Sequence, residues 1–370
     1  MRVKLKDIFD LQMGKTPSRS NLEYWNTTDY KWISIADLTK TSKYIFETKE
    51  YLSKSAIKDS GIKVIPANTV VMSFKLSIGK TAITKEDMYS NEAIMAFKDK
   101  HVINIIPEYI FYLFKYKNWE ECSNKAVMGK TLNKATLSEI EVEICSIEKQ
   151  RQIVNILDKI MSAVDGRKQE LQLLDELIKA RFVEMFGDPV KNPKGWEVVT
   201  IGDIVTEVRY GTSKPAVEGG KYPYLRMNNL TADGHLDLND LKYIDIPDDE
   251  IEKCVVRKGD VLFNRTNSIE LVGKTVVFDL QEDMIIAGYI IRVRLNKRLL
   301  PEILSQYMNL EALKDILRSM AKGAVNQANI NAQELRSIKV YIPDMELQKQ
   351  FIEMKNQVDK SKVTVQKAFE

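Results

Sequence analysis

The sequence contains little cysteine and even less histidine. Three of its 370 residues are cysteine and two are histidine. Cys122, Cys145 and Cys254 lie far apart, without the paired spacing of a disulfide framework or a zinc site. The two histidines, His101 and His235, leave little material for acid-base or metal chemistry. We therefore expect no metal site and no histidine-based catalysis.

Long hydrophobic runs are also missing. The apolar runs, such as residues 102–110, are short or interrupted by charges, and the N-terminal MRVKLKDIFD lacks the apolar centre of a signal peptide. Hydrophobic residues make up 44% of the chain and charged residues 29%, which is typical of a globular protein large enough for two domains. The 55 basic side chains barely exceed the 52 acidic ones, so charge permits a nucleic-acid partner without requiring one. The sequence thus predicts a cytoplasmic protein with no membrane partner.

Two motifs that would bind a cofactor are incomplete. A methyltransferase acting on exocyclic amines needs an Asn/Asp-Pro-Pro-aromatic loop, but Asp188-Pro189 is followed by Val190. The Gly-Lys-Thr triplets at 79–81 and 273–275 match part of a P-loop, but Phe74 and Ser268 stand where its first glycine belongs. A turn between strands is the better interpretation of these triplets. We expect no cofactor and no catalytic activity in this chain.

An internal repeat runs nearly from end to end of the chain. KLKDIFDLQMGKTPS at 4–18 matches TIGDIVTEVRYGTSKP at 200–215, with Gly14 falling on Gly211. WISIADL at 32–38 then matches YLRMNNL at 224–230, and IPANTVVMS at 65–73 matches VRKGDVLFN at 256–264. The last pair, residues 131–153 and 329–351, keeps a constant offset of 198 residues. Two copies of one folding module are the simplest interpretation.

Both copies end in a helical pattern. Apolar residues recur there every seven positions, as in a coiled-coil seam. They are Leu157, Val164, Leu171, Ile178 and Met185 after the first copy, and Phe351, Val358 and Val365 after the second. Gly166 weakens the middle of the first helix by roughly 1 kcal/mol relative to alanine and favours a bend or break there. The glycine- and proline-rich residues 187–195 end this helix and form a linker.

Within each copy, short runs rich in Val, Ile, Tyr and Phe are separated by Gly, Asn, Asp and Pro, and only the last third becomes helical. We predict an α+β fold: two similar α/β globules separated by long helices. The helices would pair as an antiparallel coiled coil and relate the globules by a pseudo-two-fold axis. The predicted boundaries are residues 1–146 for the first globule, 147–186 for the central helix, 187–195 for the linker, 196–343 for the second globule and 344–370 for the distal helix.

The whole chain resembles the specificity subunits of type I restriction-modification systems. The resemblance rests on GKTPS at 14–18, WISIADL at 32–38, IEKQRQIVNILDKI at 147–160, RFVEMFGDPVKNPKGW at 181–196 and GWEVVTIGDI at 195–204. It implies that each globule is a target recognition domain for double-stranded DNA and that the helices are spacers carrying methyltransferase subunits, two in number. It also implies restriction subunits as further partners. The chain departs from the repeat at Cys145, where the second copy has Pro343, and its distal helix is the shorter one.

Sequence readout of DNA needs side chains that make bidentate contacts with base edges, chiefly Arg, Lys, Asn and Gln on loops that reach the major groove. Each copy offers several polar loop segments of this kind. The candidates in the first copy are Lys15, Arg19, Asp37, Thr39, Lys75, Lys80, Lys130 and Asn133. Those in the second are Tyr210, Lys214, Arg226, Asn228, Asn229, Arg265, Asn267, Lys274, Lys322, Gln327 and Asn331. The copies differ most in these segments, as two domains that read different half-sites would.

Two other functions fit the sequence. The same recognition modules serve type II-like systems in which a nuclease and a methyltransferase are fused, so such a partner is an alternative. The coiled-coil helices would also suit an adaptor that bridges proteins and never binds DNA. A DNA-dependent complex with a methyltransferase would exclude the adaptor.

Overall fold

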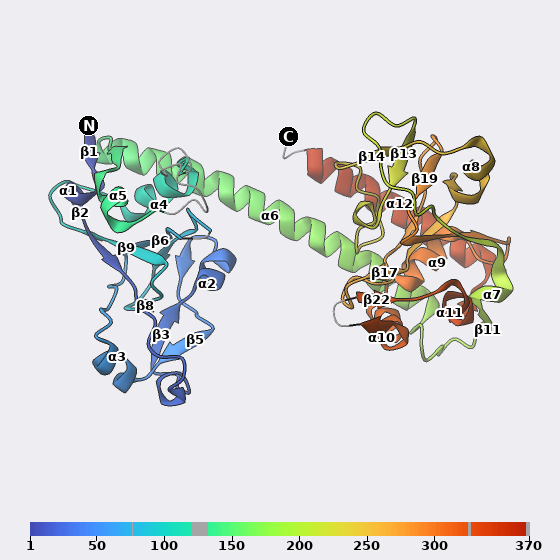
Figure 1. Ribbon diagram of the computed structural model, residues 1–370, viewed down its shortest axis with the longest axis horizontal. Coiled ribbons are helices and arrows are strands. Elements are labelled where there is room, and N and C mark those ends of the chain that lie inside the picture. The colour runs from blue at the N-terminus through green and yellow to red at the C-terminus, as the bar shows by residue number, and fades with distance from the viewer. Residues whose placement is uncertain (76, 120–131, 325–326, 368–370) are drawn as a thin grey trace. The chain divides into compact units, whose positions relative to one another are not determined.

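Figure 1 shows the computed structural model, which describes residues 1–75, 77–119, 132–324 and 327–367. These residues form two compact units, Met1–Val164 and Asp165–Glu370. One helix, α6 (Ile147–Phe186), begins in the first unit and ends in the second. Within the described ranges, no helix is long and apolar enough to cross a membrane.

The first unit contains two sheets and one closing pair of strands. Its larger sheet has the order β2-β9-β6-β7-β4 and its smaller sheet the order β5-β3-β8, while β1 pairs with β10. The strands are β1 (Arg2–Lys4), β2 (Phe9–Met13), β3 (Tyr30–Ile33), β4 (Tyr44–Ile45), β5 (Glu50–Leu52), β6 (Val70–Ser73), β7 (Thr81–Thr84), β8 (Tyr89–Ser90), β9 (Ile94–Asp99) and β10 (Glu141–Glu143). The helices are α1 (Leu5–Ile8), η1 (Leu22–Tyr24), α2 (Ile35–Lys40), α3 (Lys54–Ser60), α4 (Pro107–Tyr116) and α5 (Lys134–Glu139).

The second unit repeats this topology. The sheet β12-β20-β16-β18 corresponds to β2-β9-β6-β7, the order β14-β13-β19 to β5-β3-β8, and the pair β11-β23 to β1-β10. The strands are β11 (Glu197–Thr200), β12 (Val205–Tyr210), β13 (Tyr222–Leu225), β14 (Lys242–Ile244), β15 (Val255–Val256), β16 (Val261–Asn264), β17 (Thr266–Asn267), β18 (Thr275–Val277), β19 (Met284–Ile286), β20 (Ile290–Leu295), β21 (Lys322–Ala324), β22 (Gln327–Asn329) and β23 (Lys339–Ile342). The helices are α7 (Ile201–Ile204), η2 (Met227–Asn229), α8 (Asp248–Cys254), α9 (Pro301–Met308), α10 (Glu311–Met320), α11 (Ala332–Ser337) and α12 (Met345–Lys367). The predicted α+β fold with two similar modules is confirmed.

The glycines that the repeat aligns are required by a close backbone contact. A Cβ atom on Gly14 would lie 2.2 Å from the carbonyl oxygen of Asn91, just beyond β8. A Cβ atom on Gly211 would lie 2.2 Å from the carbonyl oxygen of Ile286, at the end of β19. Only glycine allows the chain to pass over the strand end at this distance. The loops that carry Lys15 and Thr212 therefore start from the same place in both units.

The heptad residues of α6 contact two different surfaces. In the first unit, Leu157 packs with Ile153 and Met161 against the core of that unit. In the second unit, Ile178 lies in the hydrophobic core together with residues of α12. Helix α6 continues through Gly166, so the break that this glycine favours does not occur.

The second half of α6 pairs with α12 in the antiparallel direction. Phe351, near the start of α12, packs against Phe182 and Phe186 near the end of α6, with ring centroids 5.2 and 5.6 Å apart. Further along α12, Lys362 forms an ion pair of 2.5 Å with Asp175, which precedes those phenylalanines. The order along one helix is thus the reverse of the order along the other. Within the second unit, this pairing is the antiparallel seam that the heptads predict.

A fully buried glutamine holds the start of each long helix. The side-chain oxygen of Gln348 accepts a 3.0 Å hydrogen bond from the backbone N–H of Leu300, and its amide nitrogen donates to the carbonyl groups of Arg298 and Pro343. Residue Leu300 is the N-cap of α9 and has no side-chain cap of its own. One side chain therefore satisfies three backbone groups around the point where α12 begins.

Gln150 makes the same three contacts in the first unit. It accepts from the N–H of Ile106, the N-cap of α4, and donates to the carbonyl groups of Asn104 and Cys145. Cys145 and Pro343 thus offer equivalent carbonyl groups, although their side chains differ. The departure from the repeat at this position does not change how the helix is anchored.

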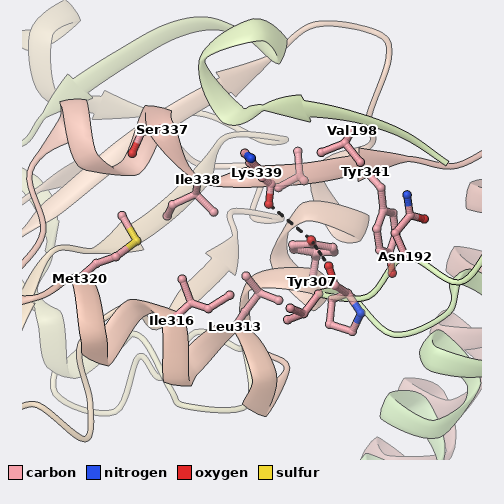
Figure 2. A pocket seen from close by; sticks show the side chains of 13 residues that line it. Asn192, Val198, Tyr307, Leu313, Ile316, Met320, Ser337, Ile338, Lys339 and Tyr341 are labelled. Carbon is pink, nitrogen blue, oxygen red and sulfur yellow. Dashed lines mark hydrogen bonds between the residues drawn. The ribbon is translucent and has the colours of Figure 1, made fainter. Parts of the chain in front are cut away.

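The segment that follows α6 is anchored to the second unit by two buried tyrosines. The Tyr307 hydroxyl donates to the carbonyl of Pro189 at 2.7 Å, and the Tyr341 hydroxyl donates to the carbonyl of Gly187 at 3.2 Å. Both rings line an apolar pocket of about 350 Å³ together with side chains from α10 and β23. Figure 2 shows Tyr307 beside Lys339, and the Tyr307 hydroxyl lies 3.4 Å from the Lys339 carbonyl oxygen. Burial raises the pKa of both tyrosines well above the ordinary value, so both hydroxyls keep their protons as donors.

The glutamine contacts give a stability prediction. Replacing Gln348 with leucine keeps most of the side-chain volume but leaves three backbone groups without a partner, so the free energy of unfolding should fall by about 2 to 5 kcal/mol. Urea denaturation followed by circular dichroism measures this change. The exposed Gln357→Leu on the same helix is the matched control and should change stability by no more than about 0.5 kcal/mol. Equal stabilities for the two variants would show that the amide contacts are dispensable.

Candidate nucleic-acid interface

In the second unit, a short sheet brings several of the predicted DNA contacts together. Strands β21 and β22 form an antiparallel hairpin, and β22 also pairs with β17, where Asn267 lies opposite Ala328. The backbone N–H of Ile330 donates to the carbonyl of Arg265 at 2.9 Å. Lys322 and Gln327 lie on the two strands of this hairpin. Segments that are about 60 residues apart in the sequence thus form one surface around Arg265.

Arg265 is held by an aromatic ring. Its guanidinium carbon lies 5.0 Å from the centre of the Tyr210 ring, and the Tyr210 hydroxyl accepts a 2.8 Å hydrogen bond from the backbone N–H of Ala332. The Nε atom of Arg265 is buried and has no hydrogen-bond partner among the described residues. Among the ion pairs of the described residues, none involves Arg265. A half-buried arginine held on a tyrosine without a carboxylate partner is well placed to bind an external acceptor.

The residues around Arg265 include one polar network and one exposed aromatic side chain. The buried Asn264 amide donates to the carbonyls of Thr266 and Tyr289, and Asn267 donates to the Asn264 side-chain oxygen at 2.9 Å. Tyr289 is exposed, and its carbonyl accepts from the backbone N–H of Arg265. Sequence reasoning missed Asn264 and Tyr289 because both belong to strand-like runs. Asn267 is partly committed to holding the loop.

Other predicted contacts in the second unit lie elsewhere or have protein partners. Arg226 pairs with Asp240 at 2.7 Å, and Lys214 pairs with Glu250 at 2.9 Å. Asn229 is buried and accepts from the Arg226 backbone N–H, while Asn228 beside it is exposed. Asn331 caps α11 by accepting from two backbone N–H groups.

The predicted contacts of the first unit lie in separate loops. Arg19 pairs with Glu50 through both carboxylate oxygens and stacks 3.7 Å from the Trp25 ring centre. Lys15 donates to the carbonyl of Ser60, and its own carbonyl accepts from Trp32. The Arg19 loop therefore resembles the Arg265 loop in placing an arginine on an aromatic ring, but here the charge is paired.

The remaining first-unit candidates divide between structural and exposed positions. Asp37 forms a capping box with Ser34 at the start of α2, and the Thr39 hydroxyl donates back to the carbonyl of Ile35. Asn133 caps α5 by accepting from the Thr136 backbone N–H. The other three are Lys75, which is half-buried near the Phe74 ring, Lys80, which is exposed, and Lys130, which lies outside the described residues.

The two Gly-Lys-Thr turns differ in the exposure of their lysines. Lys80 is exposed, but Lys274 is buried and its ammonium group donates to the Met227 carbonyl at 2.7 Å. Nearby, the buried Lys314 of α10 donates to the carbonyl of Gly273 at 2.8 Å and to the side-chain oxygen of Asn309 at 2.9 Å. Burial lowers the pKa of Lys274 and lowers that of Lys314 to about 8. Lys274 thus fixes the turn onto η2 rather than facing solvent.

Comparison with known proteins gives a family match over most of the chain. The family described as the type I restriction modification DNA specificity domain matches residues 1–176 and again residues 193–368. The chain is 30% identical to the type I restriction enzyme MjaIX specificity subunit of Methanocaldococcus jannaschii over 250 residues, which are 61% of this chain and 57% of that protein. It is 25% identical to the EcoKI specificity subunit of Escherichia coli K12 over 268 residues, 68% of this chain and 58% of that one. The matched parts thus span a little over half the length of these two relatives.

Solved structures share the fold. A chain from a study of complex assembly and conformational transition of the type I R-M system matches with a TM-score of 0.58 at 18% identity, covering 100% of this chain and 92% of that chain. The type I restriction-modification S subunit from M. genitalium matches with a TM-score of 0.52 at 13% identity, covering 100% and 91%.

Lys314 gives a prediction about pH. Its pKa is about 8 in the folded protein against an ordinary value of 10.5, so the unfolded chain binds more protons between these values. Stability should therefore rise by about 1 to 2 kcal/mol from pH 8 to pH 9.5. Urea denaturation across this range measures the slope. Lys314→Met should remove most of the rise, whereas the exposed Lys297→Met should keep it. A stability difference between the parent and Lys314→Met that does not change across this pH range would contradict the burial of a charged Lys314.

Proposed function

The chain belongs to the type I restriction modification DNA specificity domain family, and we propose that it is the subunit through which such an enzyme recognises a two-part DNA target. In this proposal the chain catalyses no reaction itself, acts in the cytoplasm on double-stranded DNA, and assembles with two methyltransferase subunits and with restriction subunits. The observation that carries the proposal is the duplicated topology with different polar loops on each copy. A shared framework with different side chains at the same loop positions suits two domains that read different half-sites.

We take residues 1–146 and 196–343 as the two recognition domains, 147–186 and 344–370 as the spacer helices, and 187–195 as the linker. Strand pairing supports the domain ends, because β1 pairs with β10 and β11 pairs with β23. The first and last strands of each proposed domain therefore lie side by side. A domain with adjacent ends can be exchanged without changing the path of the rest of the chain.

In the second domain we assign base readout to the surface around Arg265. An arginine binds O6 and N7 of guanine with two hydrogen bonds, and the Tyr210 ring restricts the guanidinium before binding. Lys322 and Gln327 of the hairpin, with Asn267 and Asn331, are the further candidate contacts there, and Asn228 is a candidate contact elsewhere in this domain. Lys214, Arg226, Asn229 and Lys274 have protein partners, and we assign them to holding the loops.

In the first domain, Lys15, Arg19, Lys75, Lys80 and Lys130 remain the candidate DNA contacts, while Asp37, Thr39 and Asn133 hold their own helices. Glu50 would have to release Arg19 for direct base contact. The paired Arg19 therefore fits a role in shaping the loop at least as well as one in reading a base.

The helices offer a surface for methyltransferase subunits. Large apolar side chains are exposed along α6 and α12: Ile156, Ile160, Leu173, Leu177, Val183 and Val363. Ile156 and Ile160 are four residues apart, as are Leu173 and Leu177, so each pair lies on one face of the helix. Exposed apolar side chains at helical spacing are typical of protein interfaces. We propose that methyltransferase subunits cover these positions.

The function is tested by expressing the chain with its methyltransferase and sequencing the methylated sites of the host genome. We expect a motif of two short specific sequences separated by an unspecified spacer. Replacing residues 1–146 with the corresponding domain of another specificity subunit should change one part of the motif and leave the other. Changes in both parts would contradict two independent recognition domains, and methylation that never depends on this chain would support the adaptor alternative.

Arg265 should discriminate at one base pair. Arg265→Ala should reduce discrimination there by about 1 to 3 kcal/mol, while the other half of the motif keeps its specificity. Binding of the complex to duplexes that differ at single positions measures this effect. Arg318→Ala is the matched control, because Arg318 is in the same unit and already pairs with Glu311 and Asp315. A uniform loss on every sequence would mean that Arg265 contacts only the backbone.

A further inference from the structure

The first unit contains an open groove, and of the candidate DNA contacts above only Lys15 lines it. Its volume is about 860 Å³, and it follows β2 from the start of α5 to the turn after α3. Helices α5 and α3 lie at opposite ends of this unit (Figure 1), so the groove extends along it. Six lysines line it: Lys6, Lys15, Lys63, Lys98, Lys100 and Lys134. The acidic residues that line it are Asp10 and Glu92.

Most of these lysines are not neutralised by carboxylates. Lys6 pairs with Glu139 at 2.5 Å, and Lys100 lies 3.6 Å from Asp10. Lys98 donates to the neutral side chain of Gln12 at 3.2 Å, and Lys15 donates to a backbone carbonyl. Within the part of the chain that the structure describes, Lys63 and Lys134 are exposed and form no ion pair. Four of the six charges are therefore available to an external anion.

The acidic residues do not cancel this charge. Glu92 accepts a hydrogen bond from the Thr16 hydroxyl, which lowers the pKa of that carboxyl with smaller contributions from Lys75 and Arg19, so Glu92 stays ionised and offsets one lysine charge. Asp10 lies opposite Lys98 in the β2–β9 ladder and close to Lys100. The lining residues together carry four more positive than negative charges.

The corresponding strand pair of the second unit, β12 and β20, carries basic residues that are paired with carboxylates. Arg294 occupies the place of Lys98, since it lies opposite Glu207 in the β12–β20 ladder as Lys98 lies opposite Asp10. Arg294 pairs with Glu207 at 2.9 Å and with Asp260 at 2.8 Å, and the buried Arg292 pairs with Glu207 as well. The basic residues on this part of the second unit thus have carboxylate partners. On this strand pair, cationic charge without a carboxylate partner is found in the first unit.

We infer that this lysine groove holds the phosphate backbone of double-stranded DNA, so that the first unit contributes sequence-independent affinity that the second lacks. This inference rests on the proposed function. Lysine ammonium groups bind phosphates as point charges without reading bases. Pockets for small molecules are mostly apolar and enclosed, whereas this groove is open and charged. Strand β2 spans five residues, or about 17 Å, which equals the axial rise of about five base pairs of DNA.

The test uses the complex of the full chain with its methyltransferase subunits. The groove variant Lys63→Gln/Lys98→Gln/Lys134→Gln removes three lysines that have no carboxylate partner among the described residues. The control variant Lys40→Gln/Lys49→Gln/Lys54→Gln removes three exposed lysines of the same unit that form no ion pair within the described residues and do not line the groove. Binding to a random-sequence duplex is measured from roughly 50 to 200 mM KCl. A third variant, Lys63→Arg/Lys98→Arg/Lys134→Arg, retains the charge.

The groove variant should lower the slope of log K against log salt by about 2 to 3, with a loss of affinity on the order of 10- to 100-fold for all sequences. The control should change the slope by less than about 1, and the arginine variant should restore it. The methylated motif should stay the same. If the parent complex binds DNA and the groove variant has the same slope, the inference is wrong but the proposed function stands. The same holds if the groove variant fails to assemble with methyltransferase in the absence of DNA, because the groove would then bind that subunit. A parent complex that binds no duplex overturns the proposed function as well.

Discussion

The buried side-chain amide at the start of each long helix is the constraint on which the arrangement of each unit depends. In each unit, one backbone N–H and two backbone carbonyl groups from two segments of the chain meet there. Gln150 and Gln348 satisfy them with one side chain each. An apolar side chain of the same size would fill the space but leave the backbone groups unpaired, which costs more than the contact itself yields. The start of each long helix is therefore fixed relative to its own sheet, and the loops on that sheet keep a defined direction relative to the helix.

The basic residues divide according to whether a carboxylate lies within reach. Arg292 and Arg294 share Glu207, Arg294 also pairs with Asp260, and this network joins β20 to β12 and to the turn before β16. Arg265 and most of the groove lysines lack such partners, and they lie on open surfaces of the described chain. A small net charge over the whole sequence thus conceals local differences, because the acidic residues neutralise one part of the basic residues and leave another part unpaired.

The repeat, the long helices and the fold class could be predicted from the sequence because each depends on local or regularly spaced residues. Gly14 and Gly211 match because both avoid the same backbone contact, and the heptads of α6 mark its buried face. The residues of the candidate interface are harder to predict. Asn and Asp side chains cap helices and also contact bases. Asp37, Asn133 and Asn331 all cap helices in this structure, so residue type alone does not separate the two roles. The lysine groove has no signal in the sequence, because its residues come from separate segments and never form a run.

The pairing of β1 with β10 has a consequence for synthesis of the chain. Strand β1 includes Arg2, and its partner strand ends at Glu143, so β1 can pair only after a strand about 140 residues later has left the ribosome. At about 5 to 20 residues per second, synthesis of those residues takes roughly 10 to 30 s. During that time an unpaired strand edge is a hazard for aggregation. The alternating charges of RVKLKD at the N-terminus, with Arg2, Lys4 and Lys6 beside the apolar Val3 and Leu5, make it a poor template for other chains. Lys6, which later lines the groove, is therefore one of the charges that protect the nascent chain before it folds.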